Sequence, residues 1–210
     1  KTGTLTIPNK DVDFTKADSL PLEDREKLKP NAREAMEALQ KDGIDVWMMS
    51  GDKEEAAKYW ADKAGIGHYK AKCAPTDKED LVRKLKSEGK TVAMIGDGIN
   101  DTQALALSDV SIAIGTGTDV AMDVAQVTLM TDDLSVLPYS VKLSRKTVRM
   151  IWENLFWAFI YNIICIPIAG GILYLFYDKP PIELTPMWGS ALMAFSSVSV
   201  VLNSLRLKFA

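Results

Sequence analysis

The sequence predicts an α/β domain with a parallel sheet, followed by an α-helical hairpin that spans a membrane. Short apolar runs alternate with amphipathic helical patterns over the first two thirds of the chain, and this alternation is typical of a parallel sheet covered by helices. Two later segments, Leu155 to Tyr177 and Met187 to Leu205, contain no charged residue. Because about 20 apolar residues cross a bilayer, both segments qualify as membrane spans rather than as buried helices of a soluble protein.

Composition narrows the class of protein further. The chain has 210 residues, of which 47% are hydrophobic and 25% charged, so it is neither disordered nor fibrous. A net charge of −3 argues against a nucleic-acid binder, which would show a basic surplus. The two cysteines, Cys73 and Cys165, lie far apart in unlike surroundings, so we expect no disulfide framework.

The first predicted helix spans Pro30 to Asp42, and Gly43 is placed to cap its C-terminus. Helical spacing puts four apolar residues on one face of it: Ala32, Ala35, Met36 and Leu39. The apolar run 44–49 follows and predicts a buried strand that ends at the tripeptide "SGD". This helix and strand therefore form the first α/β step of the sheet.

The pattern then repeats along the chain. Helices are predicted over Lys53 to Ala64 and from about Asp77 to Ser87, each followed by a glycine. Two further apolar strands are expected at 91–95 and 110–114, with another helix between them. We interpret His68 as lying just before a strand without a role, and Cys73 as packed against the sheet.

Polar residues follow the predicted strands where each strand ends. Ser50 follows one strand, Asp97 and Asp101 follow another, and Lys78 stands near the start of a helix. Ligands of parallel sheets bind beyond the carboxyl ends of the strands. Phosphoryl transfer needs a hydroxyl donor, a fixed cation and a carboxylate that can hold Mg²⁺, which prefers oxygen ligands.

The ordered set "KTGTLT", "SGD", "PTDK" and "GDGINDTQAL" resembles the phosphorylation domain of P-type ATPases, which has a haloacid-dehalogenase-like fold. The stretches "GTGTDVAMDVA" and "LSRKTVRMIWENLFWAFIYN" extend the resemblance into the membrane half. The resemblance implies ATP and Mg²⁺ as cofactors, together with an aspartyl-phosphate intermediate.

Individual roles come from this resemblance. It implies that six residues contact or organise the phosphoryl group: Lys1, Thr4, Ser50, Lys78, Asn100 and Asp101. It also implies two Mg²⁺ ligands, the backbone carbonyl of Thr2 and the side chain of Asp97.

The chain departs from the family pattern in two places. The family carries its phosphorylated aspartate directly before "KTGTLT", and a nucleotide-binding domain shortly after it. Only sixteen residues, Ile7 to Leu22, separate that motif from "EDREKLKP", whereas a domain needs about 50 or more. We therefore expect a remnant at 1–22, a phosphorylation domain at 23–144 and a hairpin at 145–210 with helices at about 152–177 and 187–207. The chain alone is expected to be inactive and to need the missing upstream part of the same pump.

The membrane half carries the expected transport residues. "YN", followed by a proline and then "MAFSS", resembles the copper-transporting class of heavy-metal P-type ATPases, which implies a metal path formed by Tyr161, Asn162, Met193 and Ser197. A thioether suits Cu(I), and the two spans lack the acidic or lysine side chains expected of a zinc pathway. Silver(I) stays open as a second transported ion.

Basic residues flank both spans. Arg145, Lys146 and Arg149 precede the first, and Arg206 and Lys208 end the second, so the positive-inside rule places the phosphorylation domain and the C-terminus in the cytoplasm and residues 178–186 outside. The predicted function is ATP-driven export of Cu(I) through the lipid bilayer, with no nucleic-acid partner. Two alternatives stay open: a membrane-anchored dehalogenase-superfamily phosphatase and a non-catalytic remnant.

Overall fold

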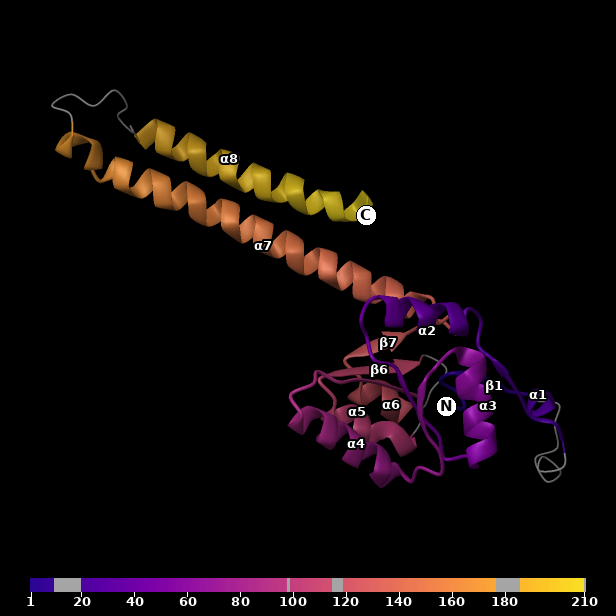
Figure 1. Cartoon of the computed structure of the whole chain (residues 1–210). Helices are drawn as coiled ribbons and strands as arrows, with labels where there is room; N and C mark the ends of the chain where they lie inside the picture. Colours follow the sequence, from indigo (N-terminus) through magenta and orange to yellow (C-terminus); the bar gives the residue numbers. More distant parts are fainter. Residues whose placement is uncertain (10–19, 98, 115–118, 177–185, 210) are drawn as a thin grey trace. The chain divides into compact units, whose positions relative to one another are not determined.

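The computed structural model describes residues 1–9, 20–97, 99–114, 119–176 and 186–209. The chain forms two compact units, Lys1–Pro138 and Tyr139–Ala210 (Figure 1). The predicted boundary lay at 144/145, close to this division. The first unit is an α/β domain, and the second is a pair of long apolar helices, as predicted.

The parallel strands of the first unit fall into two hydrogen-bonded groups. Strands β5 (Ala93–Gly96), β6 (Val110–Ile114) and β7 (Val127–Leu129) form one group in that order. Strands β3 (Trp47–Met49) and β4 (His68–Lys70) form the other. Among the described strands none joins β3 to β5. The expectation that His68 precedes a strand was wrong, because it pairs with Trp47 inside β4.

An antiparallel pair that the sequence did not predict carries the N-terminal segment. Strand β1 (Thr6–Pro8) pairs with β2 (Glu26–Leu28), and the short helix α1 (Leu22–Arg25) precedes β2. Part of the predicted remnant, residues 10–19, lies outside the described residues. The pairing anchors residues 1–6 beside the rest of the domain.

Helices cover the parallel strands in the expected order. Helix α2 (Ala32–Lys41) buries the four apolar residues predicted for its face, and Gly43 follows with φ 80°. Helix α3 (Glu54–Ala64) ends at Gly65 in the left-handed region, and α4 spans Pro75–Ser87. The short helices η2 (Ile99–Asp101), α5 (Thr102–Leu107) and α6 (Asp119–Val124) complete the unit.

The core of the β5–β6–β7 group lies under α4 and α5. It consists of five buried residues from two helices and two strands: Val82, Met94, Ala104, Leu105 and Ala113. Cys73 is also buried, and its thiol donates to the Lys70 carbonyl at 3.4 Å. Burial raises the pKa of this thiol above its usual range, so it remains protonated at neutral pH.

In the second unit, α7 (Val136–Ala169) and α8 (Pro186–Leu205) run side by side (Figure 1). Both are long and apolar enough to cross a membrane. The 3₁₀ turns η3 (Ile172–Leu175) and η4 (Arg206–Phe209) follow them. Helix α7 begins well before the predicted residue 152. Pro138 is compatible with this early start, because it falls in the first turn, where a missing N–H breaks no helical bond. It ends at Ala169, before the predicted residue 177. Two glycines follow, and Gly171 adopts φ 85°, in the left-handed region that favours glycine.

Candidate active site

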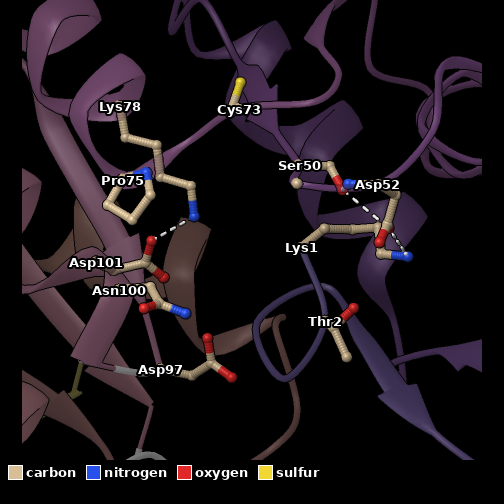
Figure 2. A pocket seen from close by; sticks show the side chains of 11 residues that line it. Lys1, Thr2, Ser50, Asp52, Cys73, Pro75, Lys78, Asp97, Asn100 and Asp101 are labelled. Atoms are coloured by element: carbon tan, nitrogen blue, oxygen red, sulfur yellow. Dashed lines mark hydrogen bonds and ion pairs between the residues drawn. The ribbon is translucent and has the colours of Figure 1, made fainter. Parts of the chain in front are cut away.

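A cavity of about 410 Å³ opens in the first unit. Its lining comes from the N-terminal segment, from the loops after β3, β4 and β5, and from the start of α4: Lys1, Thr2, Ser50, Gly51, Asp52, Cys73, Pro75, Lys78, Asp97, Asn100 and Asp101. Figure 2 shows Lys78, Asp101, Asn100 and Asp97 on one side and Ser50, Asp52, Lys1 and Thr2 facing them. Two walls from separate strand groups therefore meet at one site.

A buried ion pair holds the first wall. Lys78 Nζ lies 2.5 Å from Asp101 Oδ1, and the two side chains are only 12% and 8% exposed. Lys78 stands one turn after Pro75, which starts α4, and the Asp77 carboxylate accepts the Ala74 N–H at 2.7 Å ahead of that turn. A buried ammonium paired in this way is a fixed cation beside the cavity.

Lys1 organises the second wall. Its Nζ lies 2.6 Å from Glu26 Oε2 and 2.5 Å from Asp52 Oδ2, and its side chain is 3% exposed. Glu26 also accepts the hydroxyls of Thr2 at 3.1 Å and Thr6 at 2.7 Å. One carboxylate therefore binds three side chains of the N-terminal motif, which fixes the conformation of that loop.

Asp52 links this wall to Ser50. The Ser50 hydroxyl donates to Asp52 Oδ2 at 2.9 Å, and the Asp52 N–H donates back to Ser50 Oγ at 3.1 Å. Burial acts to raise the pKa of the Asp52 carboxyl, but the hydrogen bond and charge of Lys1 outweigh it and lower the pKa overall. Asp52 therefore stays ionised beside the cavity.

Asp97 approaches the N-terminal motif closely. Thr4 Oγ1 donates to Asp97 Oδ1 at 3.0 Å. A Cβ atom added at Gly3, where φ is +81°, would lie 1.5 Å from Asp97 Oδ2. Only glycine allows this approach, since any side chain would collide with the carboxylate. The contact places an anionic oxygen directly against the backbone that follows Thr2.

The Asp97 carboxylate and a nearby backbone carbonyl fit a Mg²⁺ ion that keeps several of its water ligands. Among the residues that the structure describes, no group of three or more His, Cys, Asp or Glu side chains could hold a metal ion. A site built from the Asp97 carboxylate and one backbone carbonyl leaves positions open for water and substrate oxygens, which is how proteins usually bind Mg²⁺.

The structure brings the predicted residues of this site together. Seven of them line the cavity: Lys1, Thr2, Ser50, Lys78, Asp97, Asn100 and Asp101. The eighth, Thr4, contacts Asp97 directly. Sequence reasoning missed two contributors, Asp52 and Glu26. Asp52 stands inside the quoted motif "SGD" and could have been included, whereas the role of Glu26 depends on the β1–β2 pairing, which no local pattern indicates.

The predicted metal-path residues are placed differently. Tyr161 lines a cavity of about 280 Å³ between α7 and α8, together with Asn154, Trp157, Ser199, Val200 and Asn203. The other three predicted residues do not line this cavity; Met193 is 70% exposed, and Asn162 and Ser197 are also exposed. Among the four residues, Tyr161 alone is in the lining of this cavity.

Polar contacts that the sequence did not indicate join the two helices. Asn203 Nδ2 donates to Asn154 Oδ1 at 2.9 Å, and Asn154 Nδ2 donates to Ser204 Oγ at 3.0 Å. Arg206 Nη1 donates to Asn203 Oδ1 at 2.9 Å. These bonds place the end of α8 at the level of Asn154 on α7.

Comparison with known proteins gives a family for the first unit. The family model for haloacid dehalogenase-like hydrolases matches residues 1–109. This range contains all eight predicted residues of the site.

The similarity to curated proteins extends into the membrane unit. The chain is 50% identical over 181 residues to a probable copper-transporting ATPase, PacS, of Synechocystis sp., covering 86% of this chain and 24% of that protein. It is 46% identical to a silver exporting P-type ATPase of Salmonella typhimurium, covering 86% and 22%. The chain thus spans about a quarter of the length of these two relatives.

A solved structure shows a similar arrangement. The crystal structure of a zinc-transporting PIB-type ATPase in the E2.Pi state matches with a TM-score of 0.72 at 30% identity, covering 86% of this chain and 28% of that one. The three similar proteins differ in the metal that their names give. These names therefore do not determine the metal, and the side chains of this chain have to indicate it.

Proposed function

This chain belongs to the haloacid dehalogenase-like hydrolase family, and on that premise we propose that it forms the phosphorylation domain and two membrane helices of an ATP-driven pump that exports Cu(I). The observation that carries the proposal is the cavity in which a buried Lys78–Asp101 pair faces Ser50 and the N-terminal motif. The curated relatives of this chain include P-type ATPases.

The chain's own residues supply most of what phosphoryl transfer requires. Ser50 and Lys78 would donate hydrogen bonds to the phosphoryl oxygens, because a hydroxyl and a fixed ammonium stabilise the charge that these oxygens carry in the transition state. Lys78 needs no reorganisation for this role, since Asp101 already holds it in place. Asn100 and Asp101 keep the loop after β5 in position.

Lys1 and Thr4 would position the residue that accepts the phosphoryl group, which the family pattern places directly before Lys1. Glu26 and Asp52 fix Lys1 from two sides, so the start of the motif cannot swing away from the cavity. Restriction of this kind holds reacting groups in line, and a displacement of about 1 Å can cost on the order of a hundredfold in rate.

The Asp97 carboxylate and the Thr2 carbonyl would hold Mg²⁺. When bound there, the ion would neutralise phosphate charge and orient the transferred group. The direct Thr4–Asp97 hydrogen bond supports the assignment, because it presents one carboxylate oxygen to Thr4 and leaves the other beside Gly3.

Copper(I) is the cargo that the membrane unit supports best. The described part of α7 after Glu153 and the whole of α8 contain no Asp, Glu, Lys or Arg. Met193 offers a soft thioether on an exposed face, and soft ligands select Cu(I) over Zn²⁺. Silver(I) shares this chemistry and is proposed as a second cargo. Tyr161, Asn162 and Ser197 would complete the path with ligands from other helices of the pump.

The orientation follows from the charges. Basic side chains gather at one end of the helix pair, where α7 enters and α8 ends. The positive-inside rule places that end, the first unit and the C-terminus on the cytoplasmic side.

Phosphorylation of the intact pump tests the proposal. We expect Asp97→Asn to abolish acid-stable labelling from γ-labelled ATP and Mg²⁺. The matched control Asp80→Asn makes the same chemical change at an exposed position of α4 and should retain full labelling. Equal labelling of the two variants would contradict the magnesium assignment. Stimulation by Zn²⁺ in place of Cu(I) would contradict the cargo.

A further inference from the structure

One end of the helix pair in the second unit carries an unusual concentration of positive charge. Six basic side chains gather there, all of them exposed: Lys142, Arg145, Lys146, Arg149, Arg206 and Lys208. Among the described residues of this unit the only acidic side chain is Glu153, and it accepts a hydrogen bond from Asn203 at 3.4 Å. The end therefore carries a net side-chain charge of about +5.

The four basic residues of α7 lie on one face of that helix. An α-helix has 3.6 residues per turn, so positions 142, 145, 146 and 149 fall within an arc of about 100°. Lys142, Lys146 and Arg149 are all exposed. A continuous cationic stripe therefore runs along the first third of α7.

The amide contacts between the helices fix the level of this stripe. Asn154 on α7 bonds to Asn203 and Ser204 at the end of α8, so the apolar parts of both helices begin at the same height. With a rise of 1.5 Å per residue, Arg149 lies about 7 Å beyond Asn154 and Lys146 about 12 Å beyond it. Arg206 and Lys208 extend α8 past the same level.

Measured from Asn154, Arg149 lies within the headgroup layer of a bilayer, and Lys146 lies just beyond it, where a long basic side chain can extend back to the headgroups. A hydrocarbon core of about 30 Å within a total thickness of 40–45 Å leaves roughly 5–8 Å of headgroups on each side. Helix α7 has 34 residues, more than the roughly 20 that cross the core, so its basic start must lie in or beyond that layer. Trp152, 67% exposed, stands at the level expected for an interfacial aromatic residue.

We propose that the cationic end of the α7–α8 pair, formed by Lys142, Arg145, Lys146, Arg149, Arg206 and Lys208, is a binding surface for anionic lipid headgroups. This inference rests on the proposed membrane function, because it requires that α7 and α8 span a bilayer. The partner is a lipid phosphate rather than an acidic protein segment, since two helices that enter the bilayer present the charges at headgroup height. Clusters of four to eight basic residues beside a membrane helix bind anionic lipids in this way.

The test reconstitutes the full 210-residue chain in phosphatidylcholine vesicles and measures the relative association constants of spin-labelled phosphatidylserine and phosphatidylcholine. We expect the wild-type chain to prefer phosphatidylserine severalfold. The double variant Lys146→Gln/Arg149→Gln should lose most of this preference, because it removes the positive charges of α7 that lie nearest the headgroup layer. The control Lys58→Gln/Lys84→Gln removes two exposed charges from the first unit and should keep the preference.

Two further measurements separate the outcomes. Resistance to alkaline carbonate extraction reports membrane integration; if the chain is extracted, the proposed membrane function fails. If the chain is integrated but shows no preference, or if the double variant keeps the wild-type preference, the lipid surface is refuted while the proposed function stands. Should the double variant not integrate, wild-type vesicles in 1 M salt decide the question, because screening must abolish a preference of this kind.

Discussion

Replacement of Gly3 by alanine tests whether the close approach of Asp97 to the N-terminal motif matters for the reaction. The substitution has two effects: it displaces the Asp97 carboxylate, and it strains the backbone at residue 3. At φ +81° a Cβ atom on residue 3 would lie 1.5 Å from Asp97 Oδ2, whereas an ordinary contact begins at about 3.4 Å. The carboxylate must therefore retreat by about 1.9 Å. This movement breaks the 3.0 Å hydrogen bond from Thr4 and carries Asp97 away from the backbone that follows Thr2.

The chain supplies a matched control for the strain. Gly43 has φ +80°, and a Cβ atom there would meet nothing within 4 Å. Alanine in the left-handed region costs about 1–2 kcal/mol, so both Gly3→Ala and Gly43→Ala should lower the free energy of unfolding by that amount. Gly3→Ala should lose about 1 kcal/mol more, because it also breaks a hydrogen bond to a partly buried carboxylate.

The two variants should differ sharply in function. A displacement of about 1 Å at a reacting centre costs on the order of a hundredfold, so a retreat of nearly twice that distance should reduce phosphoenzyme formation by at least as much. The assay is the initial rate of labelling of the intact pump by γ-labelled ATP, beside urea unfolding of each variant. If Gly3→Ala labels as fast as Gly43→Ala, the close approach of Asp97 has no part in the reaction.

Two further predictions concern the segment that follows β7. Lys29 is buried and its Nζ lies 2.6 Å from Asp132 Oδ1, so Lys29→Gln should lower the free energy of unfolding by about 1–3 kcal/mol, which urea unfolding measures. This is less than the roughly 3–5 kcal/mol expected for breaking a fully buried pair, because Asp132 is 42% exposed. The hydrogen bond from Asn31 lowers the pKa of Asp133, so its stabilising effect is present above about pH 4 and is lost as the pH falls through the lowered value. Asp133→Asn should therefore be less stable than wild type at pH 7 but not at pH 2; equal differences at both pH values would contradict this.

Much of the first unit could be predicted because the determinants are local. The buried face of α2 follows from apolar residues at helical spacing, and β6 coincides with the apolar run 110–114. The site could be predicted for a different reason. Carboxyl ends of parallel strands meet at one edge, so residues that are far apart in sequence, such as Ser50 and Asp97, converge once the strand order is known.

The features that escaped prediction depend on contacts between distant segments. Glu26 contacts Lys1 only because β2 pairs with β1, and neither strand has a distinctive local pattern. The Asn154–Asn203 contact depends on the rotation of two helices about their axes, which apolar sequences of this kind do not specify. Several expectations cannot be compared with the structure, because residues 115–118 and 178–185 lie outside the described residues.

Two of the predicted metal-path residues of the membrane unit form hydrogen bonds to their own helices. Ser197 Oγ donates to the Met193 carbonyl at 3.1 Å, and Asn162 Nδ2 donates to the Ala158 carbonyl at 2.8 Å. Polar side chains that bond to their own helix can enter a bilayer without a partner helix, because few polar groups remain unsatisfied. The thioether of Met193 is a weak acceptor with no comparable bond to lose. The Ser197 hydroxyl donates its hydrogen and keeps both lone pairs, but it offers only a hard oxygen, whereas the thioether of Met193 would offer a soft ligand to a soft ion on that exposed face. We therefore propose the thioether of Met193 as the dominant soft ligand from α8.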